Sequence, residues 1–138
     1  MDLILPRESI DKLEQVIEEE LLSNGADHVF MAHSSGNLIV EGGRLPMEQI
    51  QALAALAAAN FCATKRMAQL LGQEEFTLLF HKGTAQNVHF FRMNGDFLLV
   101  TLFGNDVSLG MIRLGSNKAT KQILSILTDL KEETSGFH

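Results

Sequence analysis

One cysteine and five histidines are the residues of this chain whose types most often do chemistry. Cys62 lies among alanines, with Lys65 and Arg66 as the nearest charges in sequence. A reactive thiolate needs a positive environment such as a helix N-terminus, and the middle of a helix offers none. We therefore expect Cys62 to be a small structural residue and not a nucleophile.

The histidines do not form a recognisable metal site in the sequence. His28 and His33 are five residues apart in an expected strand, which places them on opposite faces. His81 and His89 fall on strands expected to pair, so these two could approach each other. Two histidines without a carboxylate or a cysteine pair make a weak metal site. We expect no metal and no cofactor.

Motifs for nucleotide binding and hydrolysis are absent from the sequence. It contains neither G-x-x-x-x-G-K-[ST] nor G-x-G-x-x-G, and neither G-x-S-x-G nor H-E-x-x-H. We therefore expect no catalytic activity of its own and look for surfaces that bind other molecules.

Composition narrows the kinds of partner. The chain has 138 residues and a net charge of −6, which disfavours nucleic acid and anionic membranes as partners. No apolar run is long enough to span a bilayer, and Met1 to Glu8 does not resemble a signal peptide. A single cysteine fits a reducing compartment. We expect a cytoplasmic protein with one domain, 1–131, followed by a disordered tail, 132–138.

Eight elements follow from hydrophobic spacing and from turn and cap residues. The expected helices start at Ser9, at Pro46 and at Asp106 or Ser108, and they end near Asn24, Leu71 and Lys131. The expected strands are Asp27 to His33, Leu38 to Glu41, Glu75 to His81, Gln86 to Met93 and Asp96 to Phe103. Asn94-Gly95 predicts a tight hairpin between the last two strands.

The order α-β-β-α-β-β-β-α predicts an α+β fold with an antiparallel sheet and helices on both of its faces. The segment from Phe97 to Phe103 is apolar on both faces, which is typical of a central strand covered on both sides.

The helix that begins at Pro46 carries two stripes of interest. A seven-residue pattern predicts the side that faces the sheet and the adjacent helix: Ile50, Leu53, Ala57, Asn60, Thr64, Met67 and Leu71. The neighbouring stripe is small and uncharged until Arg66: Ala52, Ala55, Ala59, Cys62, Arg66 and Gln69. Exposed helix faces usually carry charge, so this second stripe predicts a bound surface. The alternative is that the helix is enclosed by its own fold.

The strand from Glu75 to His81 is apolar on both faces, with Phe76, Leu78 and Phe80 on one of them. At a sheet edge such a strand leaves backbone groups open to pairing. Pairing with a second copy across a two-fold axis would close this edge.

These features resemble the Roadblock / dynein light-chain family over Ser9 to Leu130, and within it the bacterial MglB-type subgroup. The resemblance rests on the element order and on the segments Ala57 to Thr64, Met67 to Gly72 and Ser108 to Leu114. The sequence departs from the family at Phe61-Cys62, where small residues are frequent, and the large ring of Phe61 could change a docking surface. The fold it implies has five antiparallel strands, with the long helix on one face and two helices on the other.

The resemblance also implies a function. Members of this subgroup form homodimers through the long helix and the third strand, and they stimulate GTP hydrolysis by a small Ras-like GTPase of the MglA type that acts in cell polarity and gliding motility. On this basis we expect GTPase contacts at Ala55, Ala59, Cys62, Ala63 and Arg66. We expect dimer contacts at Asn60, Thr64, Met67, Phe76, Leu78 and Phe80.

Three alternatives remain open at this point. Arg66 could act as an arginine finger, although the resemblance implies a mechanism without one. The protein could be a scaffold that recruits a GTPase or a motor component without affecting hydrolysis. It could also be a small-molecule sensor whose pocket is lined by Phe30, Phe76, Phe80, Phe90, Phe91 and Phe97, although such rings usually form ordinary cores.

Overall fold

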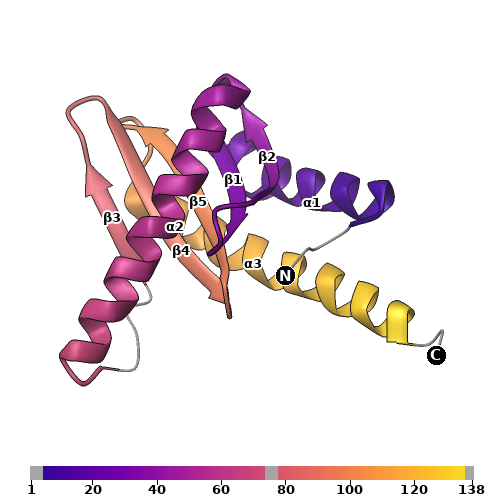
Figure 1. The fold of residues 1–138 in the computed structure, drawn as a ribbon. Coiled ribbons are helices and arrows are strands. Elements are labelled where there is room, and N and C mark those ends of the chain that lie inside the picture. Colours follow the sequence, from indigo (N-terminus) through magenta and orange to yellow (C-terminus); the bar gives the residue numbers. More distant parts are fainter. Residues whose placement is uncertain (1–4, 74–77, 136–138) are drawn as a thin grey trace.

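A computed structural model describes residues 5–73 and 78–135 of the chain (Figure 1). Its elements are α1 (Arg7–Glu20), the short 3-10 helix η1 (Leu22–Asn24), β1 (His28–His33), β2 (Leu38–Gly43), α2 (Met47–Leu70), β3 (Leu78–Lys82), β4 (Gln86–Asn94), β5 (Phe97–Gly104) and α3 (Leu109–Ser135). The predicted order of helices and strands is confirmed.

The strands form one antiparallel sheet in the order β2-β1-β5-β4-β3. β5 is central, and its residues 98–103 are all buried, as their apolar character on both faces predicts. β3 lies at one edge and β2 at the other. The expected five-stranded sheet with an edge strand after α2 is therefore present.

Two hydrophobic cores lie on the two faces of this sheet. The first joins α1 and α3 to the sheet through residues such as Leu13, Ile123 and Phe103. The second joins α2 to the sheet through residues such as Ile50, Phe30 and Val100. Figure 1 shows α2 crossing one face while α1 and α3 lie together behind the other. The opposite placement of α2 and α3 means that their outer surfaces face opposite sides of the protein.

Each proline of the chain precedes a helix, so α1 begins earlier than the start expected at Ser9 and α2 begins one residue after the start expected at Pro46. Pro6 and Pro46 occupy N-cap positions with extended backbone, at ψ 152° and 147°. The Pro6 carbonyl accepts hydrogen bonds from the N–H groups of Ser9 and Ile10. Ser9, which we expected to be the N-cap, therefore lies inside the first turn of α1. The ring of proline fixes φ near the value needed at a helix start, so it serves there without a capping side chain.

The last helix is capped by Ser108, whose Oγ accepts a hydrogen bond of 3.2 Å from the Met111 N–H. α3 then continues through Ser135, past the end expected at Lys131. Residues 132–135, which we expected to belong to a disordered tail, are helical, and 136–138 lie outside the described residues.

A buried polar cluster lies between β4, β5 and α3. His89, Thr101 and Ser116 are fully buried, and Thr120 is nearly so. The only hydrogen-bonding contact among them is a long one, 3.5 Å, between Ser116 Oγ and His89 Nδ1. Burial, together with the positive charge of Arg113, lowers the pKa of His89 to about 4. The ring is therefore neutral at pH 7.

This cluster predicts a loss of stability in mild acid. The pKa of an unfolded histidine is about 6.5, so between pH 6.5 and 4 the unfolded chain binds a proton that the folded chain does not. Stability is fully present above about pH 6.5, and we expect the free energy of unfolding to fall by up to about 3 kcal/mol as the pH approaches 4. Urea titrations across this range would measure the decrease. In the variant His89→Leu, the free energy of unfolding should fall less steeply between pH 6.5 and pH 4 than in the wild type. The same pH dependence in both proteins would show that His89 does not cause the loss.

Candidate functional site

The buried side of α2 differs from the predicted stripe. Ile50, Ala57 and Ala68 are buried, whereas Met67 and Leu71 are exposed. Asn60 and Thr64 are half-buried. A seven-residue pattern drifts by about 20° per repeat on a straight helix, so its far end turns away from the sheet. Ile50 and Ala68 are 18 residues apart, which is five full turns, and so they point in the same direction.

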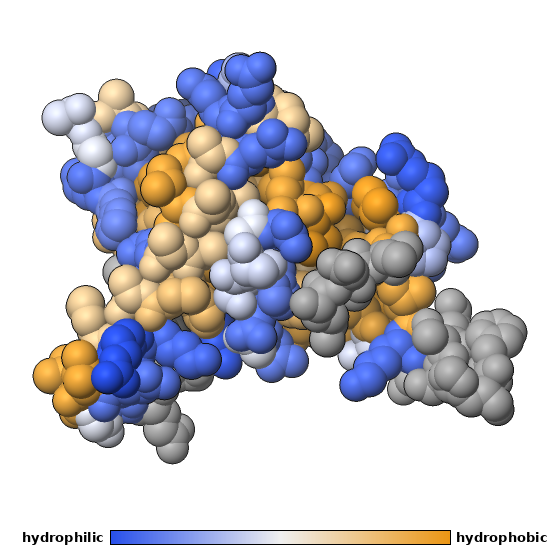
Figure 2. Space-filling model, in the orientation of Figure 1, coloured by the Kyte–Doolittle hydropathy of each residue, from blue (hydrophilic) through white to orange (hydrophobic). Residues whose placement is uncertain are grey.

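The five residues expected to contact a GTPase lie together on the outer side of α2. Ala55, Ala59, Cys62, Ala63 and Arg66 are all exposed, and we call this set the alanine face. No charged residue occurs from Ala52 to Thr64. Figure 2 shows a tan band of weakly hydrophobic surface that follows α2. This side of α2 is therefore not enclosed by the subunit's own fold, and its role as a bound surface stays a prediction.

Arg66 lies at the end of the alanine face. Its Nη1 donates a long hydrogen bond of 3.5 Å to Gln69 Oε1 one turn further along the same helix. Phe61, by contrast, packs toward the sheet with the α2 core and is partly buried. Its ring therefore contributes to the core and changes the alanine face less than the sequence alone implied.

A second exposed set on α2 consists of large apolar side chains. Leu56, Met67 and Leu70 have exposed fractions of 65%, 54% and 69%, and we call this set the apolar strip. It borders the alanine face at Ala63. Met67 was expected at a dimer contact, whereas sequence reasoning missed Leu56 and Leu70. The signal that could have found them is the seven-residue spacing of Leu56, Ala63 and Leu70 within the same helix.

The third expected contact region is β3. In the described part of the chain β3 pairs only with β4, so its other edge is open. Phe80 is partly buried against the α1–α3 core and stacks on Phe103 with ring centroids 6.0 Å apart. Leu78 begins the strand, but its side chain is outside the described part, and Phe76 lies in the undescribed segment 74–77.

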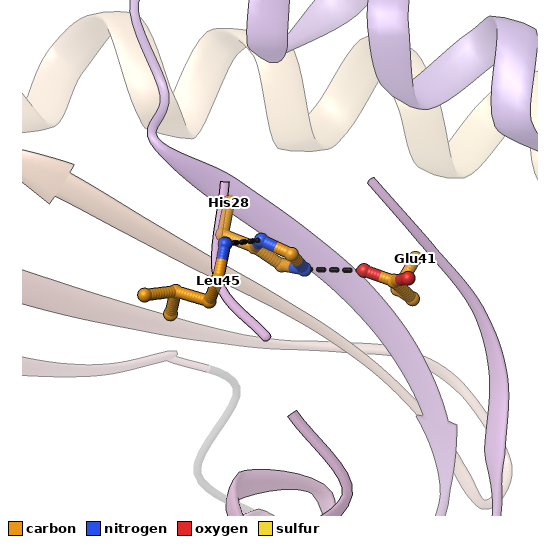
Figure 3. A network of polar contacts seen from close by, with 3 residues as sticks. All are labelled: His28, Glu41 and Leu45. Atoms are coloured by element: carbon orange, nitrogen blue, oxygen red, sulfur yellow. Dashed lines mark hydrogen bonds and ion pairs between the residues drawn. The ribbon is translucent and has the colours of Figure 1, made fainter. Parts of the chain in front are cut away.

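A buried histidine fixes the connection that leads into α2 (Figure 3). The backbone N–H of Leu45 donates to His28 Nδ1 at 3.0 Å. Because Nδ1 accepts this bond, the proton of the neutral ring is on Nε2, which donates to Glu41 Oε2 at 2.5 Å. A Cβ on Gly43 would come within 2.5 Å of His28 Nδ1, and the φ of this glycine is +132°. The β2–α2 connection is thus held at the place where α2 begins.

Replacing His28 by Phe should lower the free energy of unfolding by about 2 kcal/mol, because the volume is kept but the Leu45 N–H loses its acceptor. Glu41→Gln should cost less than about 1 kcal/mol, because an amide oxygen can still accept from Nε2. Chemical denaturation of the two variants would measure the difference. Equal losses would show that the Leu45 contact contributes nothing.

The described phenylalanines of the predicted pocket do not gather around one site. Phe30 and Phe90 belong to the core under α2, whereas Phe80, Phe91 and Phe97 pack against the core under α1 and α3. The described rings therefore lie on both faces of the sheet, and this arrangement does not support the small-molecule sensor.

The described residues contain neither a metal-binding cluster nor a membrane-spanning helix. Within residues 5–73 and 78–135, no three or more His, Cys, Asp or Glu side chains are grouped so that they could hold a metal ion. Across the same described ranges, no helix combines the length and the apolar character needed to cross a membrane.

A five-stranded antiparallel sheet with one long helix on one face and two helices on the other defines a small α+β domain. The chain belongs to the Roadblock/LC7 domain family, whose model matches residues 12–112. This confirms the resemblance drawn from the element order and from the α2 and α3 segments.

Solved structures extend the comparison to nearly the whole chain. Myxococcus xanthus MglB is 30% identical, covers 93% of this chain and 96% of its own, and superposes with a TM-score of 0.84. The gliding protein MglB of Thermus thermophilus is 25% identical, with coverages of 93% and 97% and a TM-score of 0.83. An MglB solved in a tetrameric arrangement is also 25% identical, with coverages of 93% and 96% and a TM-score of 0.84. No curated protein sequence gives a significant match.

Proposed function

We propose that this protein is a homodimeric regulator of a small Ras-like GTPase of the MglA type. In this proposal it binds the GTP-bound form through the alanine face and stimulates hydrolysis without catalytic groups of its own. The observation that carries the proposal is the exposed, uncharged outer side of α2 from Ala52 to Thr64. The similarity to MglB at 30% identity over almost the full length of both chains supports it.

The dimer in this proposal uses the apolar strip and the open edge of β3. Leu56, Met67 and Leu70 expose more than half of their surface in the single subunit, and contact between two α2 helices would remove this apolar area from water. Pairing of two β3 strands would satisfy the edge and continue the sheet across the two-fold axis. Half-buried Asn60 and Thr64 lie next to this contact and supply polar groups that fix its register.

The alanine face is suited to close approach. Alanine side chains are short, so a switch segment of the GTPase can contact the helix at short range over Ala55 and Ala59. Phosphoryl transfer depends mainly on positioning and electrostatics, so holding the GTPase's own catalytic residues in place is sufficient to raise the rate. Arg66 lies at the rim of the face, where it adds a charge contact to the partner.

The direct test uses Ras-like GTPases encoded beside this protein, each loaded with GTP or GDP. Co-purification with the GTP form would show binding, and single-turnover GTP hydrolysis with and without the protein would show stimulation. Binding without stimulation would favour the second candidate, a scaffold that recruits a GTPase or a motor component. Binding to neither form would refute both.

The role of Arg66 can be separated in the same assay. We expect Arg66→Ala to reduce stimulated hydrolysis less than about tenfold, because a rim contact contributes only modestly. A loss of about a thousandfold would instead identify Arg66 as an arginine finger.

The setting proposed for this activity is the cytoplasm, where GTPases and GTP are found. One similar protein is described as a gliding protein. We therefore propose that this regulator acts in cell polarity or gliding motility.

A further inference from the structure

A second candidate interaction surface lies on the opposite side of the sheet from α2. On α3, Ile112, Ser116, Ala119 and Ile123 are buried, so the other half of the helix faces outward. The exposed residues there include Met111, Arg113, Leu114, Lys118 and Lys121, which we call the basic face. Met111 and Leu114 expose 47% and 49% of their surface. No acidic residue occurs from Leu109 to Thr128, in a chain whose net charge is −6.

The three cations of the basic face lack a carboxylate partner among the described residues. Among the described residues, Arg113, Lys118 and Lys121 form no ion pair. The cations of α1 differ, since Arg7 and Lys12 pair with Asp11 and Glu8 on their own helix. The basic face therefore combines unpaired positive charge with exposed apolar groups, and this combination is complementary to an acidic segment that carries apolar residues.

The acidic residues of α1 limit the width of a partner that can bind the basic face of α3. α1 lies beside α3 on the same face of the sheet (Figure 1), and it exposes Glu14, Glu18 and Glu19. A flat anionic membrane or a nucleic-acid duplex laid across both helices would meet the carboxylates of α1 as well as the cations of α3, and the like charges would repel it. A single peptide segment can contact α3 alone and avoid α1.

We propose that the basic face binds a short acidic segment of a partner protein, with one or two apolar residues of that segment on Met111 and Leu114. Met111 and Lys121 are ten residues apart, about 15 Å along the helix. This length is covered by about five extended residues or by three turns of helix. The site is separate from the alanine face, so this partner and a GTPase can be held at the same time.

The test uses the full-length chain and a fluorescent peptide of about twelve residues with a pair of leucines followed by glutamates. We expect binding that weakens as the salt concentration rises from about 0.05 to about 0.3 M. The variant Arg113→Gln/Lys118→Gln/Lys121→Gln should bind at least about tenfold more weakly, since each cation contributes a modest factor. The matched control Arg7→Gln/Lys12→Gln/Arg44→Gln makes the same change in net charge elsewhere and should bind like the wild type.

A second variant and two other probes complete the test. Leu114→Ser should also weaken peptide binding, whereas all variants should keep GTPase binding if the alanine face is intact. Equal affinities for the triple variant and its control would overturn the proposal. Vesicles of phosphatidylcholine and phosphatidylglycerol that bind the wild type but not the triple variant would overturn it in favour of a membrane. Self-association at low salt that only the triple variant loses would overturn it in favour of a second copy of this chain.

Discussion

The variant Ala59→Arg should lose binding to the GTP-loaded GTPase by at least about a hundredfold while the protein stays folded and dimeric. Ala59 is exposed at the centre of the alanine face, so arginine causes no clash within the subunit. In the complex, the same side chain would separate the two surfaces and would have to lose its hydration at the contact. Calorimetry or biolayer interferometry with the GTP-loaded GTPase would measure the loss.

Two controls separate this effect from a general change. Gln15→Arg adds the same charge to exposed α1, on the opposite face of the sheet, and should leave the affinity unchanged. Ala59→Ser keeps the side chain small and should bind within a few-fold of the wild type. If Ala59→Arg binds as tightly as the wild type, the GTPase site does not lie on the alanine face.

The largest change in assembly is expected from Leu56→Asp combined with Leu70→Asp. In the proposed dimer both leucines of each subunit are buried against the other α2 helix. Burying one such side chain contributes about 1.5–3 kcal/mol, and each substitution acts twice across a two-fold axis. We expect the dissociation constant of the dimer to rise by at least about a thousandfold. Sedimentation velocity over a range of concentrations would detect the shift to monomer.

The control for this variant is Leu114→Asp, which makes the same substitution at an exposed leucine of α3. It should remain dimeric, and circular dichroism should show that both proteins keep their helices. A double variant that sediments as a dimer at the same concentrations as the wild type would show that α2 does not form the contact.

Much of the fold could be predicted because its signals are local. Asn94-Gly95 ends β4 in a tight turn with φ +55° at the glycine, and Gly72 follows α2 with φ +72°. The apolar run of β5 identified the central strand, since only a strand covered on both faces tolerates it. The start of α1 was wrong because a serine is the commoner cap, whereas here Pro6 takes that position.

The site was harder to predict because its details depend on the direction of a long helix and on distant contacts. The alanine face could be predicted because small, uncharged residues recur along one side of the expected helix. The seven-residue spacing of Leu56 and Leu70 places both on one line along α2, but whether that line faces solvent depends on how far α2 turns from the sheet. The contact of His28 with Glu41 and with the Leu45 backbone joins groups 13 and 17 residues apart, and no spacing rule indicates it.

The central position of β5 has a consequence for hydrogen–deuterium exchange. Its backbone amides are flanked by β1 and β4 and covered by helices on both faces, so deuterium reaches them only when the whole domain unfolds. The amides on the open edge of β3 exchange by local opening in the free subunit. Protection of β3 would therefore report dimer formation, while protection of β5 would report global stability, and one time course would yield both free energies.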